Sequence, residues 1–120
     1  MKKILFILAI FSILTSCEKN YVPEKEIPAW LKDITNDYEV SLLQNPNNPV
    51  LNGTAWIRYK WNNEYYFEYR SIVSSSFAYP ISFYRDTLKQ CPVCIGTDYH
   101  DNKTGKKYVW KGKEYPDTDD

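Results

Sequence analysis

The sequence predicts an α+β fold in which one helix near the amino end packs on a mostly antiparallel sheet of about five strands. Apolar residues recur near helical spacing after Pro28. From Gly53 onward the pattern changes to a period of two, and asparagine or glycine clusters separate the alternating segments. The chain of 120 residues is long enough for one domain at most.

The helix is expected to begin in the segment "IPAWL" (27–31). Proline suits a first helical turn, because the N–H group that it lacks has no partner there. Apolar or aromatic side chains then recur on one side at Trp30, Leu31, Ile34, Tyr38 and Leu42. The helix should cover 28 to about 36, and an extension to 44 stays open because Asn36, Asp37 and Val40 are weak helix formers. The segment "QNPNNP" that follows ends any helix.

The segment "TAWIRYKWNNEYYFEYRSI" (54–72) predicts a hairpin that turns at its asparagine pair. A three-residue loop at 62–64 sets Ile57 opposite Tyr69 and makes one face wholly apolar or aromatic. A two-residue loop sets Ile57 opposite Glu68 instead and mixes polar with apolar groups. Because strand register follows the separation of the two faces, the three-residue loop is the prediction.

Three further strands complete the expected sheet. The segment "FAYPISFYR" (77–85) alternates, but Pro80 cannot donate to a ladder, so this strand should lie at an edge or carry a bulge. The segments "IGTDYH" (95–100) and "KKYVWKGKEY" (106–115) are expected as the last pair. In the loop between them, Gly105 can supply a left-handed conformation.

The first residues have the pattern of a secretory signal. Lys2 and Lys3 form a basic head before an apolar run at 4–14, which is 11 residues long, against the roughly 20 that a membrane-spanning helix needs. The run ends in Leu14-Thr15-Ser16-Cys17, which resembles the bacterial lipobox. The resemblance implies that the Cys17 thiol receives a diacylglyceryl group, that the chain is cut just before it, and that the new amino group is acylated, for example with palmitate. Several acyl chains on one residue suffice for stable anchoring in a membrane.

The lipobox implies a division of the chain into four parts. Residues 1–16 are expected as a lipoprotein signal peptide, 17–28 as the lipidated cysteine with a flexible tether, 29–116 as the folded domain and 117–120 as a disordered tail. Glu18 stands where aspartate favours inner-membrane retention in lipoproteins of the enteric type. The expected location is therefore the cell envelope, with the outer membrane favoured and its periplasmic or surface face left open.

A second resemblance concerns the folded part. Small uncharacterised envelope lipoproteins open their mature domain with Ile-Pro-x-Trp-Leu and continue into a sheet rich in Trp and Tyr, and "IPAWL" at 27–31 is similar to that pattern. This resemblance implies no activity.

Charge gives little sign of a polyanionic partner. Loss of Lys2 and Lys3 from the 15 basic residues leaves 13 against 15 acidic residues, a formal charge of about −2. Nucleic acid is therefore not an expected partner. The membrane is expected as a partner through the lipid anchor, together with an envelope protein or a glycan.

The motif Cys91-Pro92-Val93-Cys94 is the most suggestive one for chemistry. In an oxidising compartment the two thiols are expected to form a disulfide. The alternative is thiol–disulfide exchange, which needs a lowered thiol pKa at a helix amino terminus. With His100 the two cysteines give three ligands, where zinc usually takes four, so neither a metal nor another cofactor is expected.

Aromatic residues opposite the expected core are the remaining candidate site. Trp56, Tyr66 and Tyr84 should share that face, with Arg70 beside Trp56, where exposed rings could bind sugar or a protein partner. The preferred interpretation is that a second layer, such as the amino-terminal segment, covers them. No catalytic constellation is recognisable, so the domain is expected to be a non-enzymatic binding or structural module.

Overall fold

The computed structural model describes residues 20–74 and 76–117. The lipobox with Cys17, the signal peptide over 1–16 and the last three residues of the expected tail lie outside the described residues. No helix within the described ranges is long and apolar enough to cross a membrane.

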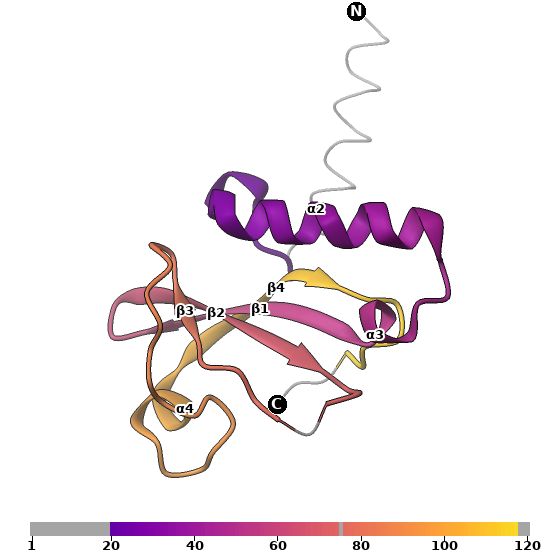
Figure 1. The fold of residues 1–120 in the computed structure, drawn as a ribbon. Coiled ribbons are helices and arrows are strands. Elements are labelled where there is room, and N and C mark those ends of the chain that lie inside the picture. Colours follow the sequence, from indigo (N-terminus) through magenta and orange to yellow (C-terminus); the bar gives the residue numbers. More distant parts are fainter. Residues whose placement is uncertain (1–19, 75, 118–120) are drawn as a thin grey trace, which may run out of the picture.

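Helix α2 (Ala29–Gln44) lies across one face of a four-stranded antiparallel sheet, with strand order β3-β2-β1-β4 (Figure 1). The predicted α+β class and the amino-terminal helix are therefore confirmed, and the helix takes the longer of the two extents that the sequence left open. Leu31 is fully buried against Trp56 and Phe67, and Trp30, Ile34 and Tyr38 pack around this cluster. The apolar spacing read from the sequence is thus the face of α2 that contacts the sheet.

Strands β1 (Thr54–Trp61) and β2 (Glu64–Ser71) form the central hairpin with a two-residue turn. Ile57 pairs with Glu68, so the predicted three-residue loop is wrong. Asn62 and Asn63 have φ values of 52° and 66°, the left-handed conformations that a two-residue hairpin turn of type I′ requires. Asparagine tolerates this region better than most residues, which makes the pair a suitable turn.

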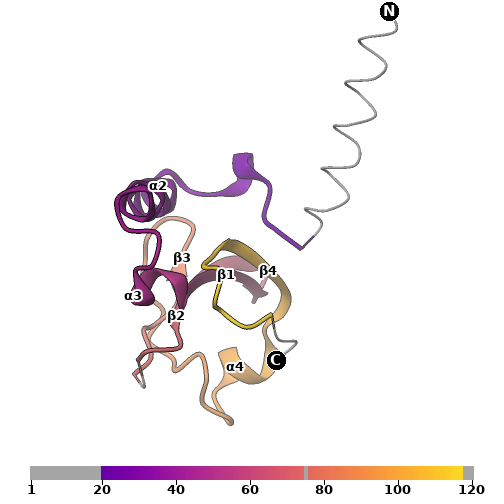
Figure 2. The ribbon, with the colours of Figure 1, turned by 90° about the vertical axis from the view of Figure 1, so that its right-hand side faces the viewer.

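The register differs from the prediction because both faces of the sheet are covered. Figure 2 shows α2 on one side of the sheet and α4 (Asp98–Asn102) on the other. Trp56 is buried beneath α2, whereas Ile57 is buried on the opposite face in a cluster with Tyr108. Clean separation into an apolar and a polar face holds only for a sheet with one solvated side.

The segment expected as a strand at 77–85 forms only the two-residue β3 (Ile81–Ser82), which pairs with β2 at the sheet edge. The edge position agrees with the prediction that was made from Pro80, which cannot donate a hydrogen bond to a neighbouring strand. The strand ends early because the chain turns back at once: the Ser82 amide donates to the Asp86 carbonyl, and Arg85 takes a φ of 74° within that turn.

The segment 95–100 was expected as a strand, and its second half begins the short helix α4. Thr97 caps this helix, because its hydroxyl oxygen accepts a hydrogen bond from the His100 amide. Strand β4 (Thr104–Lys111) then pairs with β1, and Gly105 has the expected left-handed φ of 68°.

The tether expected over 17–28 belongs to the fold from Asn20 onward. The Val22 amide donates to the Tyr108 carbonyl at 2.8 Å, and the Tyr108 amide donates to the Asn20 carbonyl at 2.9 Å. Within the 3₁₀ turn η1 (Glu24–Glu26), Glu26 forms an ion pair with Arg58 at 2.9 Å. The prediction of a flexible spacer is wrong for this stretch, because its backbone pairs with β4 and Val22 is buried.

Candidate functional site

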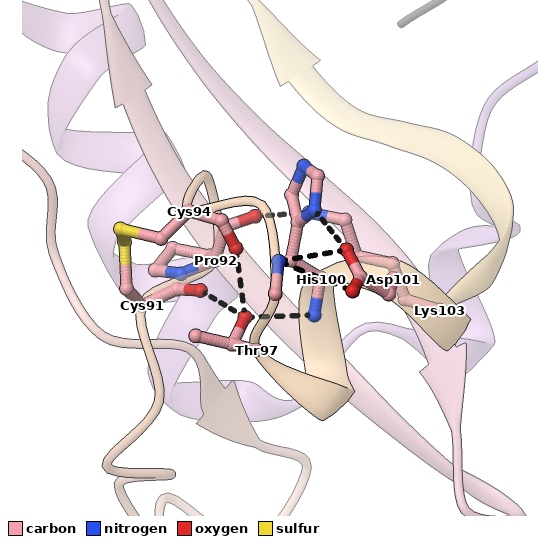
Figure 3. Close-up of a disulfide and its surroundings, with 8 residues drawn as sticks. Cys91, Pro92, Cys94, Thr97, His100, Asp101 and Lys103 are labelled. Atoms are coloured by element: carbon pink, nitrogen blue, oxygen red, sulfur yellow. Dashed lines mark hydrogen bonds and ion pairs between the residues drawn. A yellow bond between two sulfur atoms is a disulfide. The ribbon is translucent and has the colours of Figure 1, made fainter.

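The predicted disulfide between Cys91 and Cys94 is present and closes a small loop ahead of α4 (Figure 3). The two Cα atoms are 5.4 Å apart. The Thr97 hydroxyl oxygen lies 2.9 Å from the Cys91 carbonyl oxygen and 3.1 Å from that of Cys94. Thr97 therefore joins the disulfide loop to the helix that it caps.

Lys103 fastens the same loop to the sheet. Its Nζ atom donates to the Pro92 carbonyl oxygen at 2.8 Å and to Oε2 of Glu68 at 2.8 Å. The side chains of Pro92 and Glu68 are fully buried. The loop is thus held by a buried charge-assisted contact to β2, and its bonds to Thr97 are additional.

Glu68 is surrounded by three donor side chains, one from β2 and two from α4 and its C-cap. Besides Lys103, the Tyr99 hydroxyl donates to Oε2 at 2.6 Å and Arg70 Nε donates to Oε1 at 2.9 Å. Burial, and after it the negative charge of Glu68, raises the pKa of Tyr99 well above its usual range. A buried carboxylate that two cations and a hydroxyl satisfy has a structural role, and this contact set explains why Glu68 can face the core opposite Ile57.

The disulfide lacks the surroundings that activate a thiol. Cys94 is exposed and Cys91 half-buried, but α4 begins only at Asp98 and has five residues, so neither sulfur lies at a helix amino terminus. His100 Nδ1 lies 3.0 Å from Oδ1 of Asp101, and the hydrogen bond from His100 lowers the pKa of that carboxyl group. Among the described residues, no three side chains of His, Cys, Asp or Glu gather as metal ligands.

The aromatic face expected from the sequence does not form. Trp56 and Tyr66 are only 5% and 7% exposed, and they lie on opposite faces of the sheet. Trp30 of α2 contacts Trp56 at a ring-centre distance of 6.0 Å, and Tyr99 contacts Tyr66 at 5.7 Å. The preferred interpretation from the sequence, a second layer that covers these rings, therefore describes both residues. Arg70 does not lie on Trp56, because its guanidinium bonds Glu68.

Tyr84 is the one member of that set which is widely exposed, at 80%, and it lines a groove that the sequence did not reveal. The groove has a volume of 420 Å³ and lies between the β1–β2 turn and the turn after β3. Its lining is Asn63, Glu64, Tyr65, Ser82, Phe83 and Tyr84. The available signal was the asparagine pair, since the two-residue turn that it forms pairs Tyr65 with Lys60 and not with Trp61 on the expected core face.

These features define a small α+β domain with a disulfide-closed loop on one side of the sheet and an aromatic groove at one end of its hairpin. Comparison of the chain with protein-family models, with curated proteins and with solved structures found no significant match.

Proposed function

We propose that this protein is a lipoprotein of the bacterial cell envelope, anchored through acyl chains on Cys17, with a domain that acts as a non-enzymatic binding or structural module. The observation that carries the proposal is Leu14-Thr15-Ser16-Cys17 at the end of a short apolar run with a basic head. The Cys91–Cys94 disulfide supports it, because such bonds persist in oxidising compartments outside the cytosol. The outer membrane is favoured because Glu18 stands where aspartate would favour retention in the inner membrane.

Labelling with a palmitate analogue tests the anchor. The full chain, expressed in a two-membrane bacterium, should incorporate the label and sediment with outer-membrane vesicles. The Cys17→Ser variant should lose both properties, whereas a Cys91→Ser/Cys94→Ser control should keep the label because its lipidated cysteine is intact. Mass spectrometry that finds an unmodified thiol at position 17, or a mature amino terminus elsewhere, would refute the proposal.

The exposure of Cys94 favours one second candidate, a thiol–disulfide redox accessory role for the Cys91–Cys94 pair. Redox titration of the full mature protein separates the two candidates. A structural disulfide should have a reduction potential below about −300 mV and no disulfide reductase activity. A potential near that of envelope oxidants, with turnover of a disulfide substrate, would favour the redox role instead.

A further inference from the structure

We propose that the groove lined by Tyr65, Phe83 and Tyr84 binds a neutral sugar unit of an envelope glycan. The proposal rests on the proposed function in one respect, since a place in the envelope is what brings a glycan within reach. It names the ligand class for a site that differs from the aromatic face expected from the sequence.

The groove has the size and lining of a small-ligand site. Its 420 Å³ lies within the roughly 300–1,000 Å³ that is usual for such sites. The three aromatic side chains are 39%, 37% and 80% exposed, although burial of rings of this size is favourable. Exposed rings gathered around one hollow, instead of scattered singly, mark an interaction site.

Two contacts hold the aromatic lining in place before any ligand arrives. The guanidinium of Arg58, which is itself buried, lies 3.9 Å from the centre of the Tyr65 ring. On the other wall, Trp30 Nε1 donates to the Phe83 carbonyl oxygen at 3.1 Å and so ties this turn to α2. A preorganised lining loses less conformational freedom on binding, which favours affinity for a weakly interacting ligand.

The polar groups of the groove suit hydroxyl-rich ligands. The Asn63 amide, the Glu64 carboxylate and the Ser82 hydroxyl stand beside the rings. Tyr66 donates from its hydroxyl to Oε2 of Glu64 at 3.1 Å, which orients that carboxylate. A sugar ring presents C–H groups on its faces and hydroxyls at its edge, so it can pack on an aromatic ring and hydrogen-bond at its rim.

The charge of the groove favours a neutral sugar over an acidic one. Among the described residues that line it, none is Lys or Arg, and Glu64 contributes a negative charge. Two cations lie near the lining ring of Tyr65: Arg58, whose charge is paired with Glu26, and Lys60, whose Nζ is 5.9 Å from the ring centre. A second, smaller cavity of 120 Å³ shares Glu64, Ser82 and Tyr84 and adds Asp86. Carboxylates at both cavities would repel a uronate or another anionic glycan.

Titration calorimetry with the full mature protein, held in a detergent without sugar head groups, tests the proposal. The probes are neutral oligosaccharides of glucose, mannose and N-acetylglucosamine, with oligogalacturonate as the anionic comparison. At least one neutral probe should bind saturably and more tightly than oligogalacturonate. No saturable binding of any neutral probe, or tighter binding of the uronate, would overturn the proposal.

Three variants locate the binding. Tyr84→Ala should weaken binding about tenfold, which corresponds to about 1.4 kcal/mol, because it removes the most exposed ring. Tyr79→Ala is the matched control, since Tyr79 is an exposed tyrosine, at 42%, outside the groove lining. Glu64→Gln should reduce the difference in affinity between the neutral oligosaccharides and oligogalacturonate. Equal weakening in Tyr84→Ala and Tyr79→Ala, with unchanged melting temperatures, would contradict the assignment.

The outcomes separate this inference from the proposed function. Sugar binding by a chain that fails to incorporate palmitate would refute the anchor and leave the groove assignment standing. Palmitate incorporation without sugar binding would refute the groove assignment alone. An envelope protein that binds through Tyr84 while the neutral sugars do not bind would also overturn the glycan proposal.

Discussion

Replacement of Lys103 by methionine should destabilise the domain more than any ordinary surface lysine replacement. Lys103 Nζ donates at 2.8 Å to Glu68 and at 2.8 Å to the Pro92 carbonyl, and it lies 4.1 Å from the centre of the Tyr59 ring. Methionine keeps most of the apolar stem, so the substitution chiefly removes the charge and its two hydrogen bonds.

The magnitude follows from those contacts. A hydrogen bond to a charged group contributes roughly 1.5–3 kcal/mol, and one to a carbonyl roughly 0.5–1.5 kcal/mol. Arg70 stays beside Glu68, so the loss should be smaller than the full effect of leaving a buried charge unpaired. We expect a loss of about 2–4 kcal/mol in the free energy of unfolding, which lowers the melting temperature by roughly 10–25 °C in a domain of this size.

Thermal unfolding of the full mature protein, followed by near-ultraviolet circular dichroism, measures this effect. Lys113→Met is the matched control, because Lys113 is exposed in the turn after β4 and its replacement should change little. If Lys103→Met melts within about 2 °C of Lys113→Met, where a loss of 1 kcal/mol alone would give about 4–8 °C, the buried contact set around Glu68 does not hold the disulfide loop as described.

Three further predictions concern the backbone, the disulfide and pH. Gly112→Ala should cost about 1–3 kcal/mol by urea titration, because its Cβ would lie within 2.6 Å of backbone atoms of Leu51 and Asn52 in the short helix α3 (Pro49–Asn52); an unchanged urea midpoint would contradict this close approach. Replacement of Cys91 and Cys94 by serine should cost about 2 kcal/mol from the four-residue loop, and full stability in the double variant would show that the bond is dispensable. Stability should fall as pH rises above about 10, because the unfolded chain releases the Tyr99 proton that the folded chain retains. The Tyr99→Phe variant should lose less stability than the wild-type protein as pH rises. An identical loss of stability in both proteins would show that the Tyr99 hydroxyl is exposed to solvent in the folded state.

Local chemistry made several elements predictable from the sequence. Pro28 marks the start of α2, and Pro80 places β3 at an edge. Gly105 takes the expected left-handed conformation, although it lies within β4, at an irregularity in the pairing with β1, and not in a loop. The spacing of Cys91 and Cys94 likewise sufficed to predict their disulfide. Each of these conclusions depends on residues that are close together in the chain.

The features that the sequence did not reveal depend on distant contacts. Glu68 can face the core only because Tyr99 and Lys103, more than 30 positions away, supply donors to it. The hairpin register was misread for that reason, although the positive φ values of Asn62 and Asn63 are a local property that favours the observed turn.

The candidate site was missed for a related reason. Tyr84 was included among the expected binding residues, but its neighbour in the groove, Tyr65, was assigned to the core face by the predicted register. The observed register pairs Tyr65 with Lys60. Trp56 was expected on the face of the sheet opposite the core. In the structure α2 packs on that face, and Trp56 is buried beneath it. Sequence alternation shows which residues share a face of a sheet, but it does not show which face another layer covers.

The pairing of Asn20 and Val22 with β4 has a consequence for how an acylated chain would sit on a bilayer. Three peptide units separate Cys17 from Asn20, a span of at most about 10 Å. The folded domain would therefore lie directly against the lipid head groups and could not move far from them. It would meet binding partners by lateral diffusion in the membrane plane, and only partners that also reach the membrane surface.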